Sequence, residues 1–467
     1  MRVSPKRKFN VILILCVILF ASLLPAGRAE SGAKYVFLFI GDGMGAAQRN
    51  AAEIYLAGLR ESGGEIDIRE AQMAMNTLPV NGFIRTNSKS GVTDSAAAGT
   101  ALATGHKVKN GVIAMNPDNG EKYQSIAKIA RGMGMKAGIV TSAFLQDATP
   151  AVFYGHSAKR SDRYNLGLQL VESGFEYFGG GGFSQPNGSG GKSRGLYDAA
   201  AANGYAVIKD LNENPSALKV IAVHPGLSAG YMPWVIDNPR GPTLADFVDY
   251  GIKRLDGPEG FFMMIEGGKI DLACHANDSA TTIYETLAMD EAVARALDFM
   301  RTKPESTLIV VTSDHETGGM SFDASNTSAV KFYQSLAPRR GSYAQFEGRV
   351  SPKRDSKLET YIKMAKDFFG PFINETDAVK HAFRLSMTPK KERAGIEPDY
   401  EKLYATYDPF TMACVKAADA AAGIKWSTYY HTGRDVPVSA AGYGAALFAG
   451  EYENTDVAGK ILSAITK

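Results

Sequence analysis

Four segments of the chain are apolar at nearly every position: residues 34–40, 136–140, 261–265 and 307–312. Uninterrupted apolar runs of this length are typical of strands that are buried on both faces, as in a parallel sheet. Helical patterns fill the stretches between them, at residues 46–59, 125–132, 165–173, 243–255 and 279–301. Strands that alternate with helices predict an α/β fold with a central, mainly parallel sheet and helices on both faces.

The pattern changes between about residues 321 and 430. Charged, helix-prone pieces such as 355–369 and 409–421 replace the apolar strands there, which predicts a helix-rich insertion. We expect a last strand at 445–449 and a C-terminal helix at 456–465 after it. Glycine-rich stretches at 179–182 and 188–191 predict surface loops.

The N-terminus has a basic start, an almost wholly apolar run over residues 11–25, and small residues at 27 and 29. This pattern predicts a signal peptide, residues 1–29, cleaved near Ala29. The apolar run is shorter than the ~20 residues that a membrane span needs, which makes an uncleaved anchor the lesser alternative. We therefore expect an exported protein, periplasmic or extracellular, whose mature part is residues 30–467.

Cleavage would also change the charge, because residues 1–29 contain five basic residues and no acidic one. The formal net charge then falls from +2 to −3, and no surplus of basic residues indicates a nucleic-acid-binding surface. Cys274 and Cys414 remain in the mature chain. Export permits a disulfide between them, and the sequence leaves open whether they meet.

Residues 91–105 join an extended lead-in to an alanine-rich segment, and alanine is a strong helix former. Asp94 and Ser95 are therefore expected at a helix N-terminus, where free N–H groups and the helix dipole favour an anion such as phosphate. Ser95 can act as a nucleophile if an activator is present. The alternative is that Ser95 only caps the helix.

Metal-binding residue types gather where the apolar segments end. They are Asp42, Glu266, Asp271, His275, Asp314 and His315, with His431 ahead of the expected last strand. Asp271 and His275 are four residues apart, so one helical turn would direct both at one ion. Mixed Asp and His ligands suit Zn²⁺, whereas a set of Asp, Glu and Thr oxygens suits Mg²⁺.

Each of these pieces also has an ordinary structural explanation, as a helix cap or as a histidine with no functional role. The glycine spacing at residues 41–46 even matches a dinucleotide-binding fingerprint. Asp42 is a poor neighbour for a pyrophosphate unless a cation lies between them. Because every cluster falls at a strand end or in a glycine-marked loop, we favour a multi-metal site for phosphoryl transfer.

Seven segments of this chain, in family order, resemble the alkaline phosphatase family: residues 39–45, 93–97, 146–150, 156–160, 266–275, 313–319 and 431–433. They span most of the chain from about Tyr35 onward. The resemblance is weakest in the insertion, which corresponds to the variable crown region of the family.

The resemblance implies an exported phosphomonoesterase that releases inorganic phosphate through a phosphoserine intermediate, and a homodimer that acts on small phosphomonoesters. It implies that Ser95 is the nucleophile and that Arg160 binds two phosphate oxygens. The implied metal ligands are Asp271, His275 and His431 for one Zn²⁺, Asp42, Asp314 and His315 for a second Zn²⁺, and Asp42, Thr149 and Glu266 for one Mg²⁺, with Asp147 beside it or joined through water.

Two departures from the family concern the third site. Leu272 stands where well-known branches carry Lys or His, and the usual Lys companion of Asp147 is missing. The third ion could therefore differ from Mg²⁺.

The sequence favours three other functions less. A sulfatase nucleophile is followed by Pro two residues on and by Arg four residues on, but Ala97 and Gly99 stand there. A phosphodiesterase of the same superfamily is less favoured, because such enzymes often use Thr as nucleophile and lack an arginine placed like Arg160. A non-catalytic phosphate- or metal-binding protein is disfavoured because each implied zinc site has three protein ligands and leaves one position open.

Overall fold

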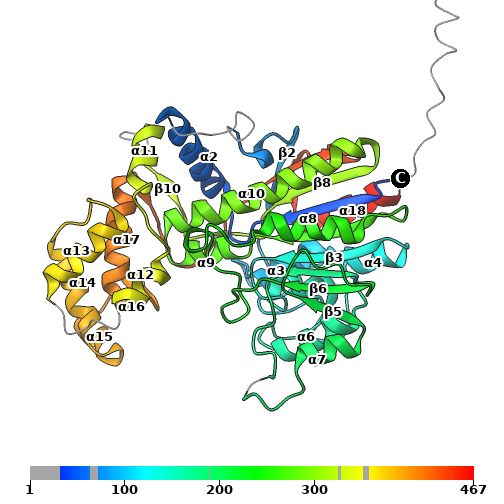
Figure 1. The fold of residues 1–467 in the computed structure, drawn as a ribbon, viewed down its shortest axis with the longest axis horizontal. Helices are drawn as coiled ribbons and strands as arrows, with labels where there is room; N and C mark the ends of the chain where they lie inside the picture. The colour runs from blue at the N-terminus through cyan, green and yellow to red at the C-terminus, as the bar shows by residue number, and fades with distance from the viewer. Residues whose placement is uncertain (1–31, 64–71, 189, 324–327, 351–356, 467) are drawn as a thin grey trace, which may run out of the picture.

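The computed structural model describes residues 32–63, 72–188, 190–323, 328–350 and 357–466. A ten-stranded sheet lies at the centre, in the order β14-β2-β13-β8-β1-β7-β3-β4-β6-β5. Helices cover both faces of this sheet, and a group of helices extends from one end of it (Figure 1). The predicted signal peptide lies outside the described residues. No helix within the described ranges is long and apolar enough to cross a membrane.

The four predicted buried strands are present at the centre of the sheet. The strands are β1 (Tyr35–Ile40), β2 (Val80–Arg85), β3 (Lys136–Thr141), β4 (Tyr177–Gly180), β5 (Tyr205–Ile208), β6 (Lys219–Val223), β7 (Phe261–Glu266), β8 (Thr307–Thr312), β13 (Val436–Gly442) and β14 (Gly450–Glu453). Only β13 runs antiparallel to its neighbours β2 and β8, while the other adjacent pairs are parallel. The mainly parallel sheet is confirmed.

Strand β1 shows why its sequence is apolar throughout. Val36, Leu38 and Ile40 pack into the hydrophobic core on one face of the sheet, and the residues between them pack into the core on the other face. The first core is covered by α3 (Ser95–Thr104), α4 (Ile126–Gly132), α5 (Ala148–Tyr154), α6 (Arg163–Glu172), α7 (Leu196–Ala202) and α18 (Asp456–Thr466). The second is covered by α2 (Ala46–Glu61), α8 (Leu244–Leu255), α9 (Lys269–His275) and α10 (Ser279–Thr302).

The predicted insertion is helix-rich, as expected. It begins at β10 (Ser321–Phe322) and ends at β11 (Ile424–Lys425), and these two short strands pair antiparallel in a small sheet of their own. Between them lie α11 (Ala329–Leu336), α12 (Tyr343–Val350), α13 (Leu358–Phe369), α14 (Asp377–Met387), α15 (Lys390–Ile396), α16 (Tyr400–Tyr404) and α17 (Pro409–Ala421). The insertion has a hydrophobic core of its own, with Phe346 and Phe410 fully buried. It projects beyond the end of the sheet (Figure 1).

Two predictions from the sequence are wrong. Residues 445–449 are not a strand, because Ala445–Phe448 forms a 3₁₀ helix between β13 and β14, entered through Gly444 at φ +74°. The glycines at 179–182 do not form an exposed loop, because Gly179 and Gly180 belong to the buried strand β4. A Cβ atom at Gly181 would lie 1.7 Å from the carbonyl oxygen of Ala143, so close backbone approach rather than a surface turn requires glycine there.

Candidate active site

The candidate site lies at the carboxyl edge of the sheet. Strands β7, β1 and β8 are adjacent and in register, with Glu266, Ile40 and Thr312 side by side at their ends. Asp42 lies in the loop after β1, α9 follows β7, and Asp314 and His315 follow β8. His431 begins the short strand β12 (His431–Thr432) just ahead of β13, and because β13 is antiparallel, its beginning lies at the same edge. This is the edge where ligands bind in open α/β sheets.

The first group consists of Asp271, His275 and His431. The Nε2 atom of His275 lies 3.2 Å from Asp271 Oδ2 and 3.1 Å from His431 Nε2, and His431 Nε2 lies 3.7 Å from Asp271 Oδ1. The expectation that one turn of α9 brings Asp271 and His275 together is therefore correct. His315 also adjoins this group, since its ring stacks on that of His431 with centroids 3.7 Å apart.

Backbone carbonyls fix how these two histidines are protonated. The Nδ1 atom of His275 lies 2.5 Å from the carbonyl oxygen of Tyr429, and that of His431 lies 2.8 Å from the carbonyl oxygen of Thr93. A carbonyl only accepts, so both Nδ1 atoms carry hydrogen, and each Nε2 atom can bind a cation when its ring is neutral. The two Nε2 atoms lie 3.1 Å apart, a distance at which a proton on one of them can bridge both, and a bound cation would take the place of that proton.

The charges in this first group are strongly perturbed. Burial alone would raise the pKa of Asp271, but His275 and His431 hold it well below its ordinary value. Burial lowers the pKa of His275, yet the charge of Asp271 outweighs it and raises the value to about 9. The three side chains therefore act as one coupled unit.

The second group consists of Asp42, Asp314 and His315, all buried. The Nε2 atom of His315 lies 3.2 Å from Asp314 Oδ2 and 3.5 Å from Asp42 Oδ1. Among the described residues, neither of those carboxylate oxygens has a hydrogen-bond partner. Burial, and then the charge of Asp314, raises the pKa of Asp42 well above its ordinary value. Burial, and then the charge of Asp271, raises the pKa of Asp314 to about 7.

Unpartnered buried carboxylate oxygens are costly unless they are protonated or bind a cation. The second group therefore fits a divalent ion held by two carboxylates and one imidazole, a donor set suited to Zn²⁺.

The third group contains only oxygen donors. Thr149 Oγ1 lies 3.5 Å from Asp42 Oδ2, so Asp42 faces both the second and the third group. Glu266 accepts hydrogen bonds from Thr141 and Thr149. Burial, and then the charge of Asp147, raises the pKa of Glu266 to about 8. This donor set fits a hard cation such as Mg²⁺.

Ser95 is the first residue of α3, as expected, and is only 3% exposed. Its Oγ lies 3.3 Å from His315 Nε2, beside the second group. The alternative that Ser95 caps the helix is wrong, because Asp94 is the N-cap and accepts a hydrogen bond from the N–H of Ala97. The hydroxyl of Ser95 is therefore free of a capping role.

Arg160 faces the same edge between two carboxylates. Its Nη1 donates to Asp94 Oδ2 at 3.2 Å and its Nη2 donates to Asp147 Oδ1 at 3.3 Å. Asp94 also accepts from the N–H of Gly111 at 2.9 Å, so its carboxylate is held from two sides. Asp94 and Asp147 orient the planar fork of the guanidinium, which suits bidentate binding of phosphate.

All of the predicted site residues thus lie along one edge. Sequence reasoning missed the residues behind them, above all Thr317. Its Oγ1 donates to Asp271 Oδ1 at 2.5 Å and lies 3.2 Å from His315 Nδ1, so it joins the first two groups. His315 and Thr317 are two positions apart, and in an extended segment that spacing puts both side chains on one face. This two-residue spacing is the signal in the sequence that could have pointed to Thr317.

Cys274 and Cys414 are both buried and free, so no disulfide joins them.

A sequence profile described as alkaline phosphatase matches residues 33–170 and 187–467. The chain belongs to the alkaline phosphatase family. Alkaline phosphatase 3 of Bacillus subtilis (strain 168) is 28% identical to it over 493 residues, which cover 100% of this chain and 98% of that protein. The alkaline phosphatase of Escherichia coli (strain K12) is 32% identical over 401 residues, with coverage of 73% and 82%.

A solved structure agrees with this assignment. The crystal structure of Thermus thermophilus alkaline phosphatase has 26% sequence identity to this chain and a TM-score of 0.78, and the match covers 95% of each chain. As an alkaline phosphatase, the protein is a metal-dependent phosphoric monoester hydrolase.

Proposed function

We propose that the three groups are the metal sites of an enzyme that hydrolyses phosphate monoesters through a phosphoserine at Ser95. Asp271, His275 and His431 would hold one Zn²⁺. Asp42, Asp314 and His315 would hold a second Zn²⁺. The observation that carries the proposal is the convergence of the Nε2 atoms of His275 and His431 next to unpartnered carboxylate oxygens of Asp42 and Asp314.

The third site would hold Mg²⁺ through Asp42, Thr149 and Glu266, with Asp147 beside it. The absence of nitrogen donors in this group supports the choice of ion. Leu272 occupies the position in α9 next to Asp271, so no additional charged side chain enters from there.

The bound cations would supply positive charge that lowers the pKa of the serine hydroxyl and of water, and that neutralises the phosphoryl oxygens. Ser95 Oγ would attack phosphorus and form the phosphoserine while the leaving alcohol departs on the opposite side. Arg160 would bind two of the remaining oxygens, with its fork oriented by Asp94 and Asp147. Water would then hydrolyse the phosphoserine and release inorganic phosphate.

The test is hydrolysis of a chromogenic phosphomonoester and its diester by protein that has been stripped with a chelator and given back Zn²⁺, Mg²⁺ or both. We expect turnover of the monoester to return with Zn²⁺, to increase with Mg²⁺ and to rise towards alkaline pH. Preference for the diester would indicate a phosphodiesterase instead. Bound ions without any turnover would indicate a non-catalytic binding protein.

Ser95→Ala provides the residue-level test, with Ser335→Ala as its matched control. Ser335 is also a buried helical serine, but its hydroxyl bonds only the carbonyl of Ala421 in the insertion. We expect Ser95→Ala to lose nearly all turnover and to retain bound metal and phosphate affinity. Ser335→Ala should remain active.

We also propose that the mature chain, residues 30–467, is exported to the periplasm or the extracellular space and forms a homodimer. Family membership supports both statements. N-terminal sequencing of the secreted protein and its mass in solution test them.

A further inference from the structure

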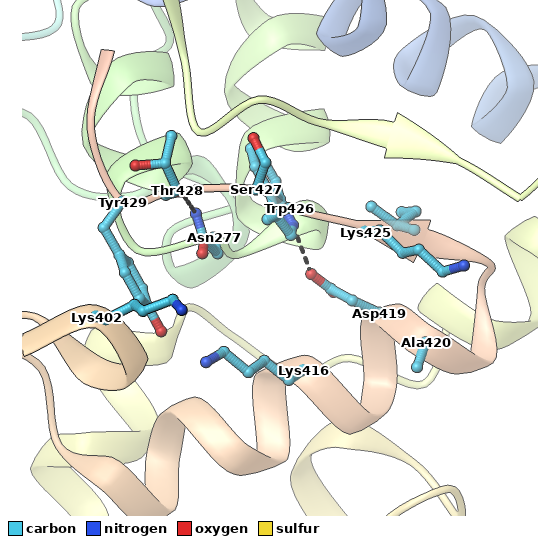
Figure 2. Close-up of a pocket in the computed structure, with 11 residues that line it drawn as sticks. Asn277, Lys402, Lys416, Asp419, Ala420, Lys425, Trp426, Ser427, Thr428 and Tyr429 are labelled. Atoms are coloured by element: carbon cyan, nitrogen blue, oxygen red, sulfur yellow. Dashed lines mark hydrogen bonds between the residues drawn. The ribbon is translucent and has the colours of Figure 1, made fainter. Parts of the chain in front are cut away.

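A second pocket, of about 260 Å³, lies in the insertion. It is formed by α16, the C-terminal half of α17 and the segment of residues 426–429 that follows β11. Six residues carry its chemistry, and we call it the lysine pocket: Lys402, Lys416, Asp419, Trp426, Thr428 and Tyr429 (Figure 2). It is separate from the metal groups, because the carbonyl of Tyr429 faces His275 while its side chain lines the pocket.

Two lysines of the lysine pocket have no ion-pair partner among the described residues. Lys402 and Lys416 lie on the same side of the pocket, beside Tyr429 (Figure 2), and neither forms an ion pair with a carboxylate within the described part of the chain. Lys416 Nζ donates one hydrogen bond, to the carbonyl of Leu403 at 2.7 Å, which leaves two of its three N–H groups available. The third lysine, Lys425, is already paired with Asp323 at 3.1 Å.

Asp419 provides an independent sign of a ligand. It is 2% exposed, and its Oδ2 accepts hydrogen bonds from Ser279 Oγ at 2.7 Å and from Trp426 Nε1 at 2.9 Å. Its buried Oδ1 has no hydrogen-bond partner among the described residues. Burial raises the pKa of Asp419 to about 7. Since Oδ2 already accepts twice, a proton on this carboxyl group belongs on Oδ1, which then becomes a donor.

We propose that the lysine pocket is a second anion site, which binds a phosphate group through the ammonium groups of Lys402 and Lys416 and the carboxyl group of Asp419. Ammonium groups bind phosphate through charge-assisted hydrogen bonds. The phosphate group can come from inorganic phosphate or from a small phosphorylated molecule. The pocket is larger than a phosphate ion alone requires, so both fit inside it. The inference stands independently of the proposed function.

Calorimetric titration of the metal-loaded protein with inorganic phosphate tests the site. We expect two binding events per chain, one at the metal groups and one at the lysine pocket. Lys402→Gln together with Lys416→Gln should weaken the second event at least ~10-fold, since two charge-assisted hydrogen bonds are lost. The matched control, Lys363→Gln with Lys366→Gln, removes two exposed charges from α13 of the same insertion and should keep both events.

Fluorescence gives a local readout of the lysine pocket. The chain has two tryptophans, so in a Trp234→Phe background the emission comes from Trp426, which lines the pocket. Phosphate should shift this emission, and the dissociation constant obtained from the shift should equal that of the second calorimetric event. The non-hydrolysable 2-hydroxyethylphosphonate distinguishes the two sources, because tighter binding than phosphate indicates that an organic group is also recognised.

Asp419→Asn decides the sign of the ligand charge. The amide can still accept from Ser279 and Trp426, and it offers an N–H at the position of Oδ1, so phosphate affinity should be retained or increased. A cation site would behave in the opposite way, with loss of binding in Asp419→Asn and gain in the double lysine variant. That result, the absence of any binding event that the double lysine variant weakens, or equal loss in the α13 control would overturn the proposal.

If the metal groups are not the catalytic site, turnover is absent whether or not the first event is seen, and the second event remains. The failure of the proposed function and the failure of this inference are therefore distinguishable.

Discussion

Replacement of Thr317 by valine tests how the first two metal groups are joined. Thr317 is fully buried, and its hydroxyl donates to Asp271 Oδ1 at 2.5 Å. Because that hydrogen is used, the oxygen can only accept at 3.2 Å from His315 Nδ1–H. This arrangement fixes the tautomer in which His315 Nε2 carries its lone pair towards Asp42 and Asp314.

The expected magnitude follows from these two contacts. A hydrogen bond to a charged group contributes about 1.5–3 kcal/mol, and a neutral one about 1 kcal/mol. Valine has nearly the shape of threonine, so the change removes the hydrogen bonds and preserves packing volume. Loss of groups that orient metal ligands typically costs 10- to 100-fold in metal affinity or activity. We therefore expect Thr317→Val to weaken zinc binding about 10- to 100-fold.

Zinc affinity is measured by competition with a chromogenic chelator, and kcat/KM is measured on the same samples at saturating and limiting Zn²⁺. Saturating Zn²⁺ should recover much of the activity of Thr317→Val. Thr317→Ser keeps the hydroxyl and is the matched control, with an affinity close to that of the parent protein. A valine variant that binds zinc as tightly as the serine variant would refute the role of the hydroxyl.

Two further predictions concern single side chains. Arg160→Ala should lower kcat/KM by about 10- to 100-fold, since a bidentate charge-assisted contact is lost. Arg160→Lys should recover only part of the lost activity, because lysine lacks the planar fork. Full recovery of kcat/KM with lysine would contradict bidentate binding. Burial raises the pKa of Asp419 to about 7 from an ordinary value of 3.8, against hydrogen bonds from Ser279 and Trp426. The folded protein then holds a proton that the unfolded chain releases, so the contribution of Asp419 to stability falls, by about 4 kcal/mol in total, as pH rises from about 4 to 7. Denaturant unfolding of Asp419→Asn and the parent protein at several pH values measures the difference, and parallel pH profiles would count against the shift.

The sequence predicted the centre of the sheet better than its edges. The segments that become β1, β3, β7 and β8 are buried on both faces, and an uninterrupted apolar run signals that situation directly. Strand β2 gives no such signal, because its residues alternate between buried and exposed positions over a short stretch that contains Asn81 and Gly82. The prediction of a surface loop fails at strand β4 because its glycines are required by close packing and not by a turn.

The candidate site was predictable as far as its residue types and their places at strand ends. What the sequence could not give is the set of contacts made across long separations. The carbonyls of Tyr429 and Thr93 orient His275 and His431, and any residue type can supply a carbonyl. Asp94 was expected at the helix N-terminus, but its bond to Arg160, 66 positions away, depends on tertiary packing.

The reversed strand β13 has a consequence for how the enzyme matures. His431 lies just ahead of β13, which pairs with β2 and β8, and its contact with Thr93 spans 338 positions of the chain. At about 5–20 residues per second, ribosomal synthesis needs about 20 to 70 s to cover that distance. During this interval the nascent chain already contains Ser95, yet His431, the last-made member of the first group, is still missing. If His431 is a zinc ligand, as proposed above, no shorter nascent chain can hold the complete first group.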